Sequence, residues 1–82
     1  MLGHRLQSEV YFALISYDDE KLKNMLKEAT YIYPMLLHRV LRQRGKKVME
    51  SDKVEIYDIG GRKISVMKTM NQGMPYVFNL IK

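Results

Sequence analysis

The feature that most constrains this sequence is an alternating segment, Val54 to Lys68, interrupted by the pair Gly60-Gly61. Apolar and polar residues alternate on both sides of the glycines, a period typical of strands. Glycine accepts the positive φ angles of a tight hairpin turn. The segment therefore predicts a β-hairpin.

The register of this hairpin is open between two interpretations. A two-residue Gly-Gly turn would pair Tyr57 with Ile64. A three-residue loop would sort the apolar side chains onto one face, namely Val54, Ile56, Ile64 and Val66. This cleaner separation favours the longer loop. Further along the chain, residues 70–75 predict a second turn and Tyr76 to Ile81 a short third strand, whereas residues 49–52 before the hairpin predict a polar connector.

A basic amphipathic helix is predicted upstream, within Tyr33 to Val48. Pro34 suits the first helical position, and Gly45 can adopt the left-handed conformation that ends a helix. The apolar side carries Tyr33, Leu36, Leu37, Val40 and Leu41, and the opposite side carries His38, Arg39, Arg42 and Lys46. One side can pack against a core while the other contacts an anion. Arg44 falls on the apolar side, where its stem can cover the core.

Another helix is predicted over Asp19 to Ala29, with Ser16 or Asp18 as its cap. It should stop near Ala29-Thr30, because β-branched and aromatic residues follow. The segment Leu2 to Tyr17 has two interpretations. Its apolar residues match a helical spacing, yet Val10 to Ile15 is also an apolar run of strand length. The spacing favours a helix.

These elements define an α+β fold of three N-terminal helices followed by a β-hairpin and a short third strand. The strand interpretation of the N-terminal segment would give the order β-α-α-β-β-β instead. The 82 residues suit a single domain, 1–82, and 46% of them are hydrophobic, as in globular chains. There is no cysteine, no secretory leader and no apolar run of membrane-spanning length, so we expect a cytoplasmic protein without a membrane partner.

Charge is distributed unevenly along the chain. No acidic residue occurs between Glu28 and Glu50, whereas five basic ones do: Arg39, Arg42, Arg44, Lys46 and Lys47. Cations at a helix C-terminus complement the helix dipole, but that effect needs only one or two of them. With a net charge of +5, this distribution indicates an anionic partner.

The residues for catalysis or metal binding are not apparent. His4 and His38 lie far apart, with no carboxylate at ligand spacing, and no nucleophile or phosphate-loop motif occurs. We therefore predict a protein that is not an enzyme and that has no metal and no cofactor.

The order of helix, turn, basic helix and hairpin with a basic tip resembles the winged helix-turn-helix family over about Asp19 to Lys68. This resemblance implies duplex DNA as the partner, with Pro34 to Arg44 as the recognition helix and Val54 to Lys68 as the wing. It would direct Met35, His38, Arg39 and Arg42 towards base edges and phosphates. The DNA backbone would be contacted by Lys46, Lys47, Arg62 and Lys63.

Three functional hypotheses follow. The first is a small DNA-binding protein, a transcriptional regulator that could act as a homodimer. The second is a protein-binding inhibitor or adaptor of the virus type, whose basic face meets an acidic protein surface. The third depends on the β-α-α-β-β-β order, which is similar to that of small ribonuclease toxins, and would make Tyr76 or His4 the residue to mutate first.

Overall fold

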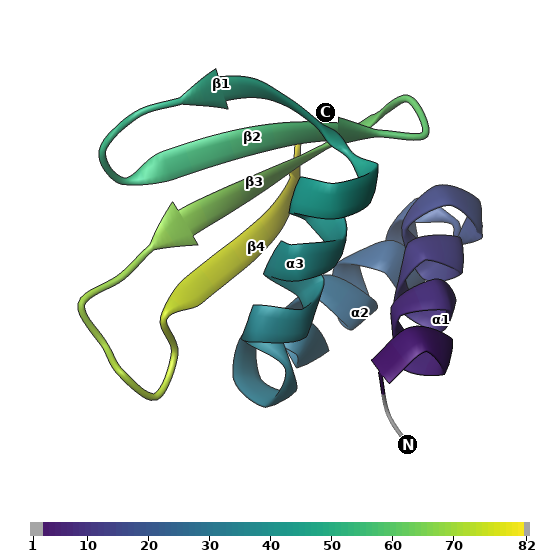
Figure 1. Ribbon diagram of the computed structural model, residues 1–82, viewed down its shortest axis with the longest axis horizontal. Coiled ribbons are helices and arrows are strands. Elements are labelled where there is room, and N and C mark those ends of the chain that lie inside the picture. Colours follow the sequence, from purple (N-terminus) through teal and green to yellow (C-terminus); the bar gives the residue numbers. More distant parts are fainter. Residues whose placement is uncertain (1–2, 82) are drawn as a thin grey trace.

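Three helices precede a four-stranded antiparallel sheet, and Figure 1 shows them gathered on one side of it. The computed structural model describes residues 3–81, with side chains from Leu6 on. The elements are α1 (Gly3–Ser16), α2 (Asp19–Ile32), α3 (Pro34–Arg44), β1 (Lys46–Glu50), β2 (Val54–Ile59), β3 (Arg62–Lys68) and β4 (Tyr76–Ile81). Each strand pairs with its neighbour in sequence, in the order β1-β2-β3-β4. The predicted α+β fold is confirmed, and β1 is an additional strand.

The N-terminal segment is a helix, so the β-α-α-β-β-β alternative is wrong. Val10, Ala13 and Leu14 are buried, whereas Phe12 is 64% exposed. Burial at steps of three and four is the helical pattern, and a half-buried strand would bury every second residue instead. The apolar run therefore reflects a helix with an exposed phenylalanine.

Asp18 is the cap of α2: its Oδ1 accepts the main-chain N–H of Lys21 at 2.8 Å. The helix continues to Ile32, beyond the predicted end near Ala29. The low helix propensity of Thr30, Tyr31 and Ile32 amounts to only a few tenths of a kcal/mol per residue, and burial of Thr30 against the sheet outweighs it. One residue, Tyr33, separates the two helices, and Pro34 then begins α3, as predicted.

Gly45 follows the last residue of α3, Arg44, but its φ of −98° is not the left-handed conformation predicted from the sequence. Glycine is needed here for space, because a Cβ would lie 2.8 Å from the carbonyl oxygen of Leu41. The chain then enters β1 directly, where a helix exit and a polar connector were expected. All five residues of β1 are exposed, so no apolar alternation in the sequence indicates this edge strand.

The β2–β3 hairpin has the two-residue Gly-Gly turn, with Tyr57 opposite Ile64, so the longer loop favoured from the sequence is wrong. Both glycines have positive φ, 61° at Gly60 and 83° at Gly61. This register turns Tyr57 and Glu55 towards the helices and leaves the opposite face without a covering layer of helices, as Figure 1 shows. The apolar pattern favoured the wrong register because the inner positions of β2 include a glutamate and a tyrosine, Glu55 and Tyr57.

The core lies between the helices and the inner face of the sheet. Its largest fully buried side chains are those of Leu14, Leu22, Leu26, Leu37, Val40, Leu41, Tyr57, Ile64 and Val66. In the arrangement of Figure 1, α2 runs along β4, α3 crosses the inner face and α1 packs against the other two helices. Among residues 3–81, no helix combines the length and the apolar character that crossing a membrane requires.

Candidate nucleic-acid interface

The exposed side of α3 carries Met35, Arg39 and Arg42, and Lys46 follows just after the helix. Steps of four and three place the first three residues on one side of the helix. These four residues, which were predicted to contact DNA, are exposed.

His38 is not part of that exposed side, and its prediction as an outward residue was wrong: it is only 7% exposed. The covered part of α3 is wider than its apolar stripe, because α1 and α2 contact the helix on one side while the sheet contacts it on another. His38 lies on the sheet side, next in sequence to the fully buried Leu37.

A hydrogen-bonded cluster holds His38 against the sheet. Its Nε2 lies 2.9 Å from Oε1 of Glu55, and the hydroxyl of Tyr57 donates to the same oxygen at 2.8 Å. The ring of Tyr76 packs on the imidazole with centroids 4.4 Å apart. Glu55 is 5% exposed, so this is a buried carboxylate that needs such donors. The cluster joins α3 to β2 and β4.

Two lysines complete the cluster on its solvent side. Lys68 Nζ lies 3.5 Å and Lys47 Nζ lies 3.8 Å from Oε2 of Glu55. Lys47 also pairs with Glu50 at 3.3 Å. These two lysines and two glutamates balance in charge, so Lys47, predicted to contact DNA phosphates, is largely neutralised by its neighbours.

The surroundings of Glu55 change its protonation behaviour. Burial alone would raise the pKa of Glu55, but the hydrogen bonds from His38 and Tyr57 and the nearby positive charges outweigh that effect and lower the pKa to about 2. The pKa of Tyr57 is raised, because its phenol is buried and donates to the carboxylate. The carboxylate is thus kept ionised and the phenol protonated.

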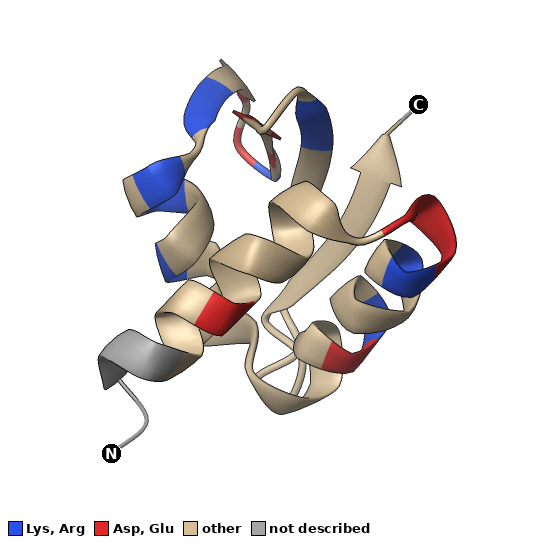
Figure 2. Ribbon diagram, turned by 90° about the vertical axis from the view of Figure 1, so that its right-hand side faces the viewer, with Lys and Arg blue, Asp and Glu red and all other residues tan. Residues whose placement is uncertain are grey.

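In contrast, Arg39, Arg42 and Lys46 form no ion pair within the described part of the chain. Figure 2 shows the Lys and Arg residues of α3 and β1 on one side of the molecule, whereas the acidic start of α2 lies on the other. The unpaired cations therefore give α3 and the start of β1 a positive surface that solvent can reach.

The other basic residues have different positions. The Arg44 guanidinium carbon lies 4.8 Å from the centroid of the Tyr11 ring, so its side chain covers part of α1. Arg62 Nη1 donates to the carbonyl oxygen of Leu14 at 3.3 Å, near the C-terminal end of α1, and is half-buried there. Lys63 is exposed. Of the two predicted wing residues, Lys63 thus faces solvent, whereas Arg62 connects the hairpin to α1.

Sequence reasoning did not place the sheet residues of the cluster beside His38, and it named Tyr76 only under the ribonuclease hypothesis; these residues are Glu55, Tyr57, Lys68 and Tyr76. The available signal was the Gly-Gly turn, since its two-residue register puts Glu55 and Tyr57 on the inner face. A glutamate at a buried position requires a partner, and His38 is one of few candidates. The side chain of His4 lies outside the described residues.

No protein-family model, curated protein or solved structure matches this chain. Among the described residues, no group of three or more His, Cys, Asp or Glu side chains is arranged to hold a metal ion.

Proposed function

We propose that this protein binds duplex DNA in the cytoplasm, as a small regulator, through the exposed side of α3 and the start of β1. One observation carries the proposal: Arg39 and Arg42 lie one turn apart, exposed and without an ion pair to any described residue, and Lys46 extends the same positive surface.

The dimensions of this surface suit a DNA groove. Arg39 and Arg42 are three residues apart on α3, a rise of about 4.5 Å along the helix, and the major groove, about 12 Å wide, admits an α-helix. The arginine fork can bind phosphate or the guanine edge with two hydrogen bonds. Each neutralised phosphate also releases counterions, so binding should weaken steeply with salt.

The test is a titration of the purified protein with duplex and with single-stranded DNA at several salt concentrations. Arg39→Ala and Arg42→Ala should each lower duplex affinity roughly tenfold or more. Lys53→Ala, which removes an exposed cation from the β1–β2 loop, should leave it nearly unchanged and serves as the matched control. Absence of salt-dependent duplex binding sinks the proposal, and recovery of an acidic protein after nuclease treatment would then favour the adaptor alternative.

RNA cleavage is a second candidate function: the strand order that suggested it is wrong, and its remaining support is the contact between His38 and Glu55. Such cleavage needs a base for the 2′-hydroxyl and an acid for the departing 5′ oxygen. Burial of both side chains, and the occupation of Glu55 Oε1 by two donors, make the cluster a better clamp than a catalyst. Incubation with RNA decides: cleavage lost in His38→Ala would support it, and intact RNA would eliminate it.

A further inference from the structure

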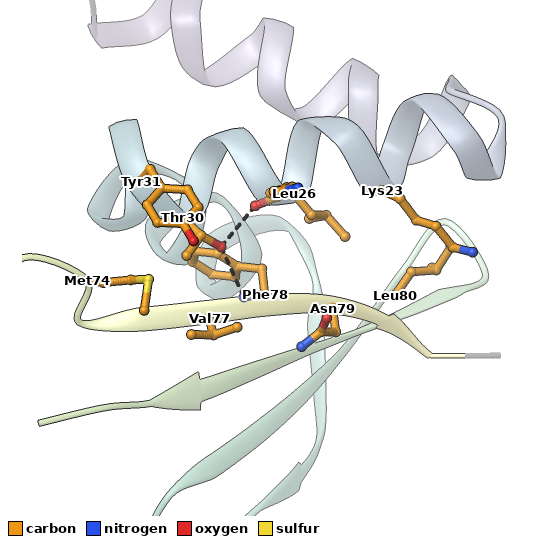
Figure 3. Close-up of a pocket in the computed structure, with 10 residues that line it drawn as sticks. Lys23, Leu26, Thr30, Tyr31, Met74, Val77, Phe78, Asn79 and Leu80 are labelled. Atoms are coloured by element: carbon orange, nitrogen blue, oxygen red, sulfur yellow. Dashed lines mark hydrogen bonds between the residues drawn. The ribbon is translucent and has the colours of Figure 1, made fainter. Parts of the chain in front are cut away.

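We propose that a cavity between α2 and β4 binds a small amphipathic carboxylate, a molecule with an apolar chain or ring and one carboxylate group. The cavity has a volume of about 370 Å³, within the range of small-molecule sites. Figure 3 shows the residues that line it: Lys23, Leu26, Lys27, Thr30, Tyr31, Met74, Val77, Phe78, Asn79 and Leu80. None belongs to α3 or β1, so the site is separate from the proposed DNA surface.

The floor of the cavity is apolar. Leu26 from α2 and Phe78 from β4 are buried there, and Met74 and Leu80 are half-buried around them, whereas the Val77 side chain lies on the opposite side of β4 (Figure 3). Covering the half-buried Met74 and Leu80 with an apolar ligand gains about 25 cal/mol for each Å² removed from water. The floor therefore favours a ligand with an apolar portion.

The rim is positively charged. Lys23 and Lys27 lie one turn apart on α2, both exposed, and neither forms an ion pair with a described residue. None of the described residues that line the cavity carries a carboxylate. Two unpaired ammonium groups above an apolar floor complement an amphipathic anion. Two lysine point charges, with no arginine fork among the described lining residues, suit a singly charged anionic group, and we assign a carboxylate.

The main chain of β4 offers the ligand a further hydrogen-bond donor, the N–H of Leu80, and the contact between Thr30 and Phe78 shows which way this edge faces. Thr30 donates its hydroxyl to the Leu26 carbonyl oxygen at 3.0 Å and accepts the main-chain N–H of Phe78 at 3.3 Å, which fixes α2 against this edge of β4 (Figure 3). Main-chain groups two residues apart in a strand point to the same edge. The N–H of Leu80 therefore also lies on the cavity side, where a carboxylate can accept it.

The experiment is a titration of isotope-labelled protein with decanoate, followed by the amide signals of Tyr31, Phe78 and Leu80. We expect saturable binding of one decanoate, at least tenfold tighter than that of decan-1-ol, which has the same chain without the charge. The double variant Lys23→Gln/Lys27→Gln should lose at least tenfold in affinity for decanoate and bind decan-1-ol as before.

The matched control is Lys21→Gln on the same helix, because the Lys21 ammonium group lies 5.8 Å from the Tyr17 ring centroid and not at the cavity. It should bind decanoate like the unmodified protein. Equal affinities for decanoate and decan-1-ol, unchanged decanoate binding in the double variant, or no saturation up to millimolar ligand would each overturn the proposal.

Discussion

His38 Nε2 on α3 lies 2.9 Å from Glu55 Oε1 on β2, and both side chains are buried. This contact fixes the rotation of α3 about its axis, because a histidine bound to the sheet leaves the side with Arg39 and Arg42 in solvent. The exposed positive surface of α3 thus depends on the buried contact between His38 and Glu55. Removing either member should alter both stability and the presentation of the arginines.

The first prediction concerns Glu55. Glu55→Ala removes the acceptor of both His38 and Tyr57 and should lower the free energy of unfolding by about 3–5 kcal/mol. Glu55→Gln keeps the shape and part of the hydrogen bonding, so its loss should be smaller, about 1–3 kcal/mol. Urea unfolding measures both. Tyr57→Phe, which removes one hydroxyl, is the control at about 1 kcal/mol, and an effect of Glu55→Ala no larger than this would contradict the clamp.

Acid should destabilise the protein through the same carboxylate. The folded-state pKa of Glu55, about 2, lies below the ordinary value of 4.5, so its contribution to stability is present above pH 4.5 and is lost as the pH falls towards 2. A shift of this size corresponds to roughly 3 kcal/mol. Chemical unfolding at pH 6, 4 and 3 would measure the decline. In Glu55→Gln the decline should be shallower, and identical pH profiles for the two proteins would refute the assignment.

The helices were largely predictable from the sequence, because their signals are local. Asp18 caps α2, Pro34 begins α3, and the apolar spacing around Val10 and Leu14 identifies α1. The strand β1 was not predictable in this way. Its side chains are all exposed, and it is held by main-chain pairing to β2, which leaves no pattern in the sequence.

The candidate site was predictable only in part, because local periodicity determines the exposure of some of its residues and tertiary contacts determine that of the others. The exposed positions of Arg39 and Arg42 follow from helical periodicity, which needs no knowledge of partners. The position of His38 depends on Glu55, a residue 17 positions away, through a strand register that periodicity misassigned. Tertiary hydrogen bonds of this kind are visible only once the register is known.

The third prediction separates the two hairpin glycines. At Gly60, φ is +61° and a Cβ would lie 2.7 Å from Ile15 Cγ2, whereas at Gly61 φ is +83° and nothing lies within 4 Å. Gly61→Ala should therefore cost only the backbone strain, about 1–2 kcal/mol. Gly60→Ala adds displacement of Ile15, about 1–3 kcal/mol more. Thermal unfolding compares them, and equal losses would show that the hairpin tip does not pack against α1.

The last prediction concerns Thr30, whose hydroxyl joins α2 to β4. Thr30→Val keeps the shape of the side chain but leaves the main-chain N–H of Phe78 without its acceptor, which should cost about 1–3 kcal/mol. Thr30→Ser keeps the hydroxyl and should retain the bond, at the smaller loss of a buried methyl, about 1 kcal/mol. Hydrogen exchange at the Phe78 amide distinguishes these effects, because loss of the acceptor speeds exchange at that amide beyond any global change. If exchange at Phe78 rises no more in Thr30→Val than in Thr30→Ser, the hydroxyl does not hold this edge of the sheet, and α2 is held there by apolar packing alone.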